Sequence, residues 1–274
     1  WKALQLQELF ARIARQKIPQ GTWQEPVAAT ATLGYRNKLV LHAGRDLQGN
    51  PAVGYYADDN RTLLDVTRCP LAHPAINARL EELRADTTFI RRIRPGAAWT
   101  FRNTERDGAI CWEGRANPEW PWLEEMTPFG PLAVPRCSFF QVNPAMAALL
   151  AETFAAAIRE FATRSLIDLY CGCGLFTLTA AAAGCSELLG IDSDALAIRA
   201  ANANAQRREL ADVRFISAPA EQALPPRLTA MPEAALLVDP PRTGLPAEVR
   251  AAIIAHRPSP LFYISCGPDT LARD

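Results

Sequence analysis

The stretch Leu166–Leu178, LIDLYCGCGLFTL, decides the fold of the second half of the chain. Its opening letters LIDL form a short apolar run that is typical of a buried parallel strand. Gly172 and Gly174 follow at once, and a helix-like apolar run comes after them. A strand, a Gly-x-Gly turn and a helix in this order predict the first unit of a doubly wound α/β sheet, which binds its ligand beyond the carboxyl end of the strand.

The residues around this turn narrow the class of ligand. The next strand-like run ends in Asp192, an acidic residue placed to bind two ribose hydroxyls. A nicotinamide-binding fingerprint has a third glycine where this chain has Thr177. The pattern therefore favours S-adenosylmethionine, which has no pyrophosphate, over a dinucleotide. A turn with only a structural role is the third interpretation.

Composition sets the class of protein. The 274 residues suffice for one large domain or two ordinary ones, and a hydrophobic fraction of 49% with 21% charged residues is typical of soluble globular proteins. The net charge of 0 excludes a global attraction to nucleic acid, so RNA binding would need a local patch. Seven cysteines without a regular spacing favour a reducing compartment. We expect a cytoplasmic monomer with no membrane contact.

The pattern divides the chain into three expected domains. Residues 1–26 form an N-terminal helical segment, with one amphipathic helix and its buried stripe expected over Trp1–Lys17. Residues 27–136 hold short strand-like runs between Gly, Asn and Asp turns, which predict an antiparallel β-rich domain with one helix near Pro74–Arg84. Its basic residues are equally compatible with a solvated strand face and an RNA contact surface; they are Arg91, Arg92, Arg94 and Arg102.

The third domain, residues 137–274, alternates strands and helices. Asn143-Pro144 predicts a helix start, with asparagine as the N-cap and proline in the first turn. From Leu166 onward, five strand-like runs alternate with helical runs, which predicts a parallel sheet with helices on both faces. The expected strands are 166–169, 187–192, 213–217, 234–238 and 260–265.

Two of these strands are followed by residues that can take part in a chemical reaction. Val238–Gly244, VDPPRTG, holds Asp239 at the sheet edge because consecutive prolines stiffen the backbone. Tyr263–Pro268, YISCGP, places Cys266 just past the last strand. Carboxyl ends of parallel strands share one edge, so the following residues are expected to face one crevice: Tyr170, Asp192, Asp239 and Cys266.

A cysteine at a ligand-binding edge suggests covalent catalysis on a pyrimidine. Carbon 5 of the ring is barely nucleophilic, but a thiolate that adds at carbon 6 creates an enolate and concentrates charge on carbon 5. Carbon 5 can then attack a sulfonium methyl group, after which a base removes its proton and the thiolate leaves. The alternative for Cys266 is a small buried apolar residue, the commoner state of a lone cysteine.

Several segments, in order, resemble the RNA uracil-5-methyltransferase family: FFQVN at 139–143, DLYCGCGLFTL at 168–178, GIDSDALAIRAANANA at 190–205, DPPRTG at 239–244 and YISCGPDTLARD at 263–274. GYRNK at 34–38 and CPL at 69–71 also resemble family segments, so the resemblance covers essentially the whole chain. It implies a Rossmann-like class I methyltransferase sheet, preceded by a smaller β-rich α+β domain. It also implies transfer of a methyl group from S-adenosyl-L-methionine to carbon 5 of a uridine in RNA.

The resemblance also implies roles for single residues. Cys266 matches the family's nucleophile, and the cofactor site is matched by Gln141, Tyr170, Asp192 and Asp239. Leu175 departs from the family, in which several members have asparagine. The family's general base, a glutamate after the nucleophile motif, and two further strands would lie beyond Asp274. We therefore expect a fragment that lacks both ends and does not turn over by itself.

Cys69 resembles the fourth cysteine of the [4Fe–4S] cluster that some family members carry, which implies a cluster ligand in the full-length protein with its partners before Trp1. A cluster-type cysteine favours 23S ribosomal RNA over transfer RNA as the substrate. Cys171 and Cys173 lack the paired spacing of a zinc site and are interpreted as small residues of a tight turn.

Three alternatives remain open. A cytosine-5-methyltransferase would carry a cysteine in the proline motif, and 239–242 has none. An amino-group methyltransferase would favour an aromatic residue where Arg242 stands. The third is a noncatalytic RNA-binding module that keeps the methyltransferase fold, against which the intact Cys266 argues.

Overall fold

The computed structural model describes residues 2–16 and 18–274. The backbone contacts divide the chain into two compact units, residues 1–28 with 151–274 and residues 29–150. The domains expected from the sequence end at 26 and 136, because they were drawn from residue patterns and not from contacts. The RNA-binding role given to residues 27–136 stays a prediction.

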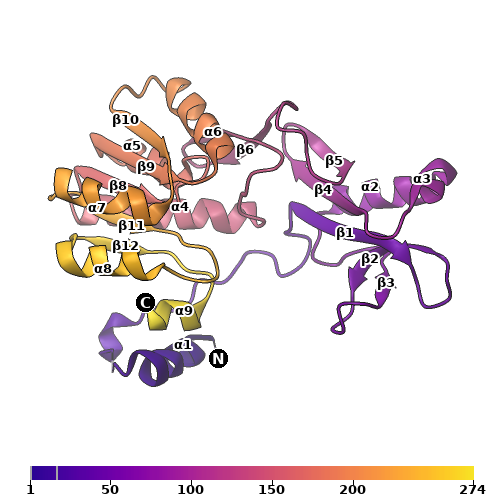
Figure 1. The fold of residues 1–274 in the computed structure, drawn as a ribbon, viewed down its shortest axis with the longest axis horizontal. Coiled ribbons are helices and arrows are strands. Elements are labelled where there is room, and N and C mark those ends of the chain that lie inside the picture. The colour runs from indigo at the N-terminus through magenta and orange to yellow at the C-terminus, as the bar shows by residue number, and fades with distance from the viewer. Residues whose placement is uncertain (1, 17) are drawn as a thin grey trace. The chain divides into compact units, whose positions relative to one another are not determined.

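The first unit is built on a parallel sheet, as the sequence predicts. Within the described residues this sheet has five strands in the order β10-β9-β8-β11-β12, and every neighbouring pair is parallel (Figure 1). The chain runs from β8 outward to β10 on one side and then to β11 and β12 on the other. The order therefore reverses beside β8, where open α/β sheets bind ligands. The strands are β8 Ser165–Leu169, β9 Glu187–Asp192, β10 Val213–Ser217, β11 Ala235–Val238 and β12 Leu261–Tyr263.

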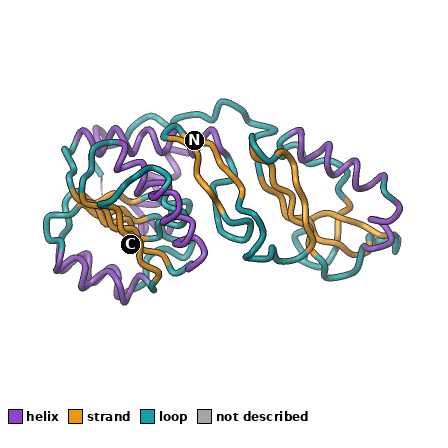
Figure 2. The backbone as a smooth tube through the Cα atoms, turned by 90° about the horizontal axis from the view of Figure 1, so that it is seen from above, coloured by secondary structure: helices purple, strands orange, loops and turns teal. Residues whose placement is uncertain are grey.

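Helices lie on both sides of this sheet (Figure 2). They are α4 Pro144–Glu160, α5 Leu175–Ala182, α6 Ala195–Gln206, α7 Ala220–Ala230 and α8 Ala247–His256; a further short helix, α9 Pro268–Arg273, follows β12. Asn143 caps α4 as expected, because its Oδ1 accepts from the N–H of Met146 at 3.2 Å. The core beneath these helices is apolar and includes Ile167, Leu169 and Val238, all fully buried. Within the described residues, none of the helices has both the length and the apolar character needed to cross a bilayer.

The N-terminal segment differs from the expectation. Helix α1 covers Lys2–Leu9 and continues as a π-helical turn over Phe10–Ala14, followed by a 3₁₀ turn at Gln20–Thr22. No described residue of α1 or of the π-helical turn is buried, and Ile13 of the expected stripe is 36% exposed, so the expected buried stripe is wrong. The segment packs against α9. The ends of the expected helix, Trp1 and Lys17, lie outside the described residues.

The second unit contains an antiparallel sheet, in the order β3-β2-β1-β4-β5. Two helices pack on one face of this sheet, where the core includes Leu41, Ile76 and Phe101. A separate antiparallel hairpin, β6–β7, follows. The elements are β1 Lys38–Arg45, β2 Pro51–Tyr56, β3 Leu63–Asp65, α2 Pro74–Ala85, α3 Thr87–Arg92, β4 Ala98–Thr104, β5 Gly108–Glu113, β6 Leu123–Thr127 and β7 Gly130–Val134.

The basic residues of this unit do not share a strand face. Arg91 and Arg92 end α3, a helix that the sequence reading missed. Arg102 is 1% exposed, and its Nη2 donates to Oε1 of Glu125 at 2.6 Å. The expectation that Arg102 contributes to a surface basic patch is therefore wrong, because its charge is paired inside the unit.

Candidate active site at the carboxyl edge of the parallel sheet

The turn between β8 and α5 adopts a backbone that only a few residues accept. Tyr170, Gly172 and Gly174 have φ angles of 72°, 53° and 88°, in the left-handed region. Glycine adopts this region without strain, whereas a tyrosine there is uncommon and is held by its surroundings. The N–H groups of Tyr170 and Cys171 both donate to the carbonyl of Ile191, at 2.8 and 3.1 Å. The turn is thereby fixed to the end of β9.

Neighbouring elements pack tightly against this turn. A Cβ built at Gly190 would lie 2.6 Å from Cε1 of Phe215 and 2.9 Å from Sγ of Cys171, so only glycine fits there. Asn204 of α6, which is buried, donates from Nδ2 to the carbonyl of Cys173 at 3.1 Å. The turn is thus held from β9, β10 and α6.

Asp192, at the end of β9, is oriented by the same backbone. Its Oδ2 accepts from the N–H of Gly172 at 2.9 Å and its Oδ1 from the N–H of Asp194 at 2.8 Å. The side chain stays partly exposed. Each carboxylate oxygen can accept a further hydrogen bond. A carboxylate that is held in place and partly exposed at this edge suits a ligand with two neighbouring hydroxyl groups.

Two buried polar atoms beside the turn lack a partner among the described residues. They are Oδ1 of Asp168 and the hydroxyl of Tyr170. Oδ2 of Asp168 accepts from the hydroxyl of Thr177 at 2.6 Å. Buried polar atoms are nearly always paired, so orphans beside a glycine turn point to a missing ligand or water. The residues present therefore fit a polar cofactor. The sequence reading did not single out Asp168.

Burial and negative charge raise the pKa values in this region. The pKa of Asp168 rises to about 7 because the group is buried and because Asp239 and Asp192 are nearby, although the Thr177 hydrogen bond opposes the rise. Burial raises the pKa of Asp239 to about 6. Burial also raises the pKa of Tyr170 to about 12, with further contributions from Glu221, Asp274 and Asp192. Such clustered shifts are common at functional sites.

Asp239 and Cys266 follow the two strands on the other side of β8. The N–H of Asp239 donates to the carbonyl of Leu169 at 3.3 Å, and the N–H of Ile264 donates to the carbonyl of Val238 at 2.9 Å. These bonds continue the parallel pairing past the strand ends, so both loops leave the same edge of the sheet. Cys266 is exposed and not buried behind the strands. Its thiol is therefore accessible to a substrate.

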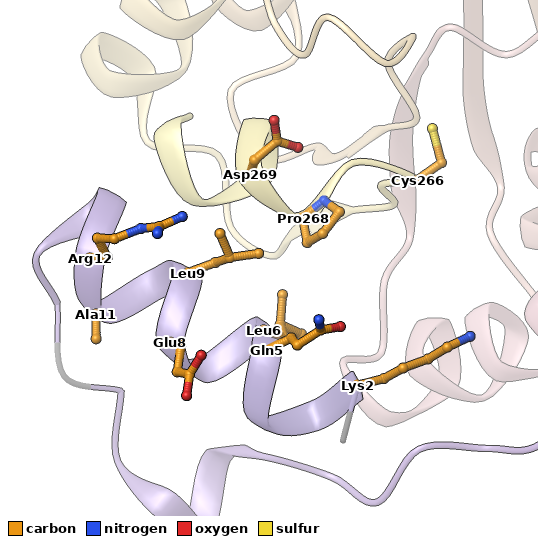
Figure 3. A pocket seen from close by; sticks show the side chains of 10 residues that line it. All are labelled: Lys2, Gln5, Leu6, Glu8, Leu9, Ala11, Arg12, Cys266, Pro268 and Asp269. Atoms are coloured by element: carbon orange, nitrogen blue, oxygen red, sulfur yellow. The ribbon is translucent and has the colours of Figure 1, made fainter. Parts of the chain in front are cut away.

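The N-terminal segment borders the nucleophile motif. A groove of about 1170 Å³ is lined by Cys266, Pro268 and Asp269 on one side and by α1 and the π-helical turn on the other (Figure 3). Figure 3 shows the sulfur of Cys266 directed away from α1. Lys2 and Arg12 also line this groove. No sequence pattern indicates this contact, because its two sides lie far apart in the sequence.

Gln141 and Cys69 belong to the other compact unit. Gln141 lies between β7 and α4. Cys69 is buried, its N–H donates to Oδ1 of Asn77 at 2.9 Å, and the hydroxyl of Tyr55 lies 3.8 Å from its sulfur. Among the residues that the structure describes, no three His, Cys, Asp or Glu side chains gather as a metal site. A [4Fe–4S] cluster needs four ligands, of which Cys69 would be one. The cluster stays a prediction.

Comparison with known proteins gives a consistent assignment. The family model described as tRNA (Uracil-5-)-methyltransferase matches residues 133–274, just over half of the chain. A Gloeobacter violaceus protein named as an uncharacterized RNA methyltransferase is 27% identical over 303 residues, covering 91% of this chain and 65% of the relative. A 23S rRNA (uracil(747)-C(5))-methyltransferase of Shewanella baltica is 36% identical over 152 residues, covering 56% of this chain and 39% of the relative.

A Schizosaccharomyces pombe tRNA (uracil(54)-C(5))-methyltransferase is 27% identical over 269 residues, covering 92% of this chain and 49% of the relative. The crystal structure of the Pyrococcus abyssi tRNA (uracil-54, C5)-methyltransferase, in complex with S-adenosyl-L-homocysteine, superposes with a TM-score of 0.72 at 20% identity. It covers 100% of this chain and 75% of that one, which shows a shared fold. The chain spans 63–66% of the length of the cyanobacterial relatives that it matches. From the match of the family model, supported by the fold, this chain belongs to the tRNA (uracil-5-)-methyltransferase family.

Proposed function

We propose that the full-length protein methylates carbon 5 of a uridine in RNA, through a covalent adduct between Cys266 and carbon 6 of the ring. One observation carries this proposal. The exposed Cys266 and the partly buried Asp239 follow neighbouring strands, β12 and β11, of the sheet whose β8 turn and β9 end carry Gly172 and Asp192. A nucleophile and a cofactor-type turn thus share one edge, as the family membership leads one to expect.

S-adenosyl-L-methionine supplies the methyl group as a sulfonium electrophile. Asp192, already oriented by the N–H of Gly172, would hold the cofactor by accepting hydrogen bonds from its two ribose hydroxyls. The unpaired hydroxyl of Tyr170 and the glycine backbone line the approach to the cofactor. By resemblance to the family, Asp239 binds the cofactor and also lies beside the target base, and Gln141 stays a cofactor contact that is predicted from the sequence.

Cys266 acts as the nucleophile. Its thiolate forms a bond to carbon 6, and the electron pair of the carbon 5–carbon 6 double bond moves into an enolate at oxygen 4. Carbon 5 then takes the methyl group as the bond between the methyl carbon and the sulfonium sulfur breaks, which leaves S-adenosyl-L-homocysteine. A base removes the proton of carbon 5, and the bond between the sulfur of Cys266 and carbon 6 breaks to restore the ring. The enzyme has to meet the target uridine either extruded from its stack or in a loop, because the edge of the ring is inaccessible in a stacked helix.

For the RNA class we propose ribosomal RNA, with transfer RNA as the second candidate. Cys69 supports the first, because it resembles the cluster cysteine of the ribosomal branch, and the Shewanella baltica relatives are named as 23S rRNA enzymes at 36% identity. The Schizosaccharomyces pombe relative, which matches 92% of this chain, supports the second. Mapping of 5-methyluridine in ribosomal and transfer RNA from a deletion strain separates them, because the lost position names the substrate.

The covalent step is tested with RNA that contains 5-fluorouridine. Fluorine at carbon 5 does not leave as a proton does, so the full-length protein with cofactor and this RNA accumulates an adduct that survives denaturing electrophoresis. Cys266→Ala abolishes the adduct, whereas Cys111→Ala, which removes a partly exposed thiol from β5, retains it. An adduct in the Cys266→Ala variant would refute the nucleophile, and no adduct in the wild type would refute the reaction.

A further inference from the structure

Asp274, which follows α9, binds several groups at once. Its Oδ2 accepts from the N–H of Leu245 at 2.7 Å and from the hydroxyl of Tyr263 at 2.7 Å. Its Oδ1 accepts from Nη1 of Arg250 at 2.9 Å and from Nη2 of Arg273 at 2.7 Å. The side chain is 1% exposed. Burial opposes its charge, but the hydrogen bonds from Leu245, Tyr263 and Arg273 outweigh it and hold the pKa of Asp274 below its usual value.

The donors come from the two segments that carry the proposed site. Leu245 closes the proline-motif loop that begins at Asp239, and Tyr263 ends β12 just before Cys266. The two arginines hold the same loop by its backbone. Nη2 of Arg273 donates to the carbonyl of Thr243 at 2.9 Å, and Nη1 of Arg250 donates to the carbonyl of Leu245 at 2.8 Å. One carboxylate therefore ties both segments together.

The packing around Gly244 shows how closely the loop and α9 fit. Gly244 has a φ angle of +75°, and a Cβ there would lie 2.5 Å from Oδ2 of Asp274 and 3.1 Å from Cβ of Thr270. Any side chain at this position would separate the proline-motif loop from α9. The turn around Cys266, by contrast, is closed by short-range bonds among Ser265, Gly267 and Thr270. Asp274 supplies the long-range tie.

We propose that Asp274 is a positioning residue, which fixes the loop carrying Asp239 against the turn carrying Cys266; its catalytic consequence rests on the proposed function. A carboxylate is suited to this task because it accepts from donors on both sides, whereas an amide at the same place would turn its NH₂ toward an arginine or toward Leu245 and Tyr263. Displacement of a reacting group by about 1 Å can slow a reaction by about 100-fold.

The experiment compares full-length wild type and Asp274→Asn in two assays. The first is the rate of adduct formation with RNA containing 5-fluorouridine, and the second is the dissociation constant for S-adenosyl-L-homocysteine by calorimetry. We expect the adduct rate to fall by about 10-fold or more while the dissociation constant rises by less than about threefold, because Asp239 is the one proposed cofactor residue that lies in the loop tied by Asp274. Asp274→Glu, which restores the charge, should recover part of the rate.

Controls separate positioning from general destabilisation. Glu160→Gln removes an exposed carboxylate from α4 and should leave both assays unchanged. If Asp274→Asn does not fold, Tyr263→Phe removes one donor without a change in charge and should lower the adduct rate with the same selectivity. An unchanged adduct rate in whichever variant folds, or equal losses in both assays, overturns the positioning role. A wild type without adduct refutes the proposed function instead.

Discussion

Thr177 donates its hydroxyl to Oδ2 of Asp168 at 2.6 Å, in the interior of the parallel sheet. This contact accounts for a threonine where a nicotinamide-binding turn has its third glycine. The threonine leaves Oδ1 of Asp168 without a partner among the described residues, directly beneath the turn. The carboxyl group of Asp168 is thus fully buried, and the nearby negative charges of Asp192 and Asp239 raise its pKa.

The first prediction concerns pH and stability. The pKa of Asp168 rises from 3.8 to about 7 on folding, because of burial first and then of the neighbouring carboxylates. Between these values the folded protein holds a proton that the unfolded chain has released. Stability due to this group is therefore complete below the unfolded pKa and is lost as the pH rises through about 7. Asp239, with a pKa raised to about 6, acts in the same direction.

Urea unfolding at about pH 5 and about pH 8 measures this effect. Wild type should lose more stability over this range than Asp168→Asn, by on the order of 2 kcal/mol. Asp212→Asn, at an exposed carboxylate of the same unit, should follow the wild type. Identical pH profiles for wild type and Asp168→Asn would contradict the proposed protonation of Asp168.

The second prediction concerns Asp192 and cofactor affinity. Asp192→Asn keeps the shape of the side chain, but its NH₂ group must face the N–H of either Gly172 or Asp194. We expect cofactor binding, measured by calorimetry, to weaken by about 10-fold, with a loss of about 1 kcal/mol in the free energy of unfolding. Asp59→Asn, where Oδ1 also accepts two backbone N–H groups, is the matched control. The remaining oxygen at position 59 can still accept both N–H groups, so this substitution should leave the affinity and most of the stability unchanged. An unchanged affinity in Asp192→Asn would remove Asp192 from the cofactor site.

The third prediction concerns the tight fit behind the glycine turn. Gly190→Ala brings a methyl group against the ring of Phe215 and the sulfur of Cys171, and overpacking of this kind costs about 1–3 kcal/mol. Thermal unfolding should show the loss. Combination with Phe215→Ala should relieve it, since the two sites are then coupled. Gly21→Ala is the control, because its Cβ would meet nothing within 4 Å among the described residues; an equal loss there would contradict the packing argument.

The sequence predicts the parallel sheet well and the contacts between distant residues poorly. All five strands of that sheet were expected, because a run such as 166–169 is apolar and a glycine turn follows it. Helix α7 was missed, because Pro225 and Pro226 lie inside it and interrupt the pattern. Prolines lose backbone donors, so they normally argue against a helix.

The environment of single residues could not be predicted for a similar reason. Arg102 was placed on a surface, because its partner Glu125 is 23 residues away and no periodicity joins the two. In the sequence Asp274 is only the last residue of a motif, whereas in the structure its carboxylate accepts hydrogen bonds from Leu245 and Tyr263. At the site, the sequence predicts which residues follow the strands. It does not predict which of them are buried or paired, since burial depends on the whole fold.

The last prediction concerns the buried pair of Arg102 and Glu125. Oε1 of Glu125 accepts from Nη2 of Arg102 at 2.6 Å and from Nε at 3.2 Å, and Nδ2 of Asn37 donates to the same carboxylate. The guanidinium also lies over the ring of Phe140, 6.0 Å from its centroid. Burial raises the pKa of Glu125 even though Arg102 and Asn37 oppose the rise, so the charges are held together against a desolvation penalty.

Glu125→Gln should therefore destabilise the protein by about 3–5 kcal/mol, because it leaves the charge of Arg102 buried without a counterion. Chemical unfolding followed by tryptophan fluorescence measures this loss in the unit that contains Trp99 and Trp112. Glu82→Gln is the matched control: it breaks the pair with Arg79, at 2.9 Å and with side chains 40% and 64% exposed, and should change stability by less than about 1 kcal/mol. Equal effects of the two substitutions would mean that water reaches Arg102, and its surface role in RNA binding would then be open again.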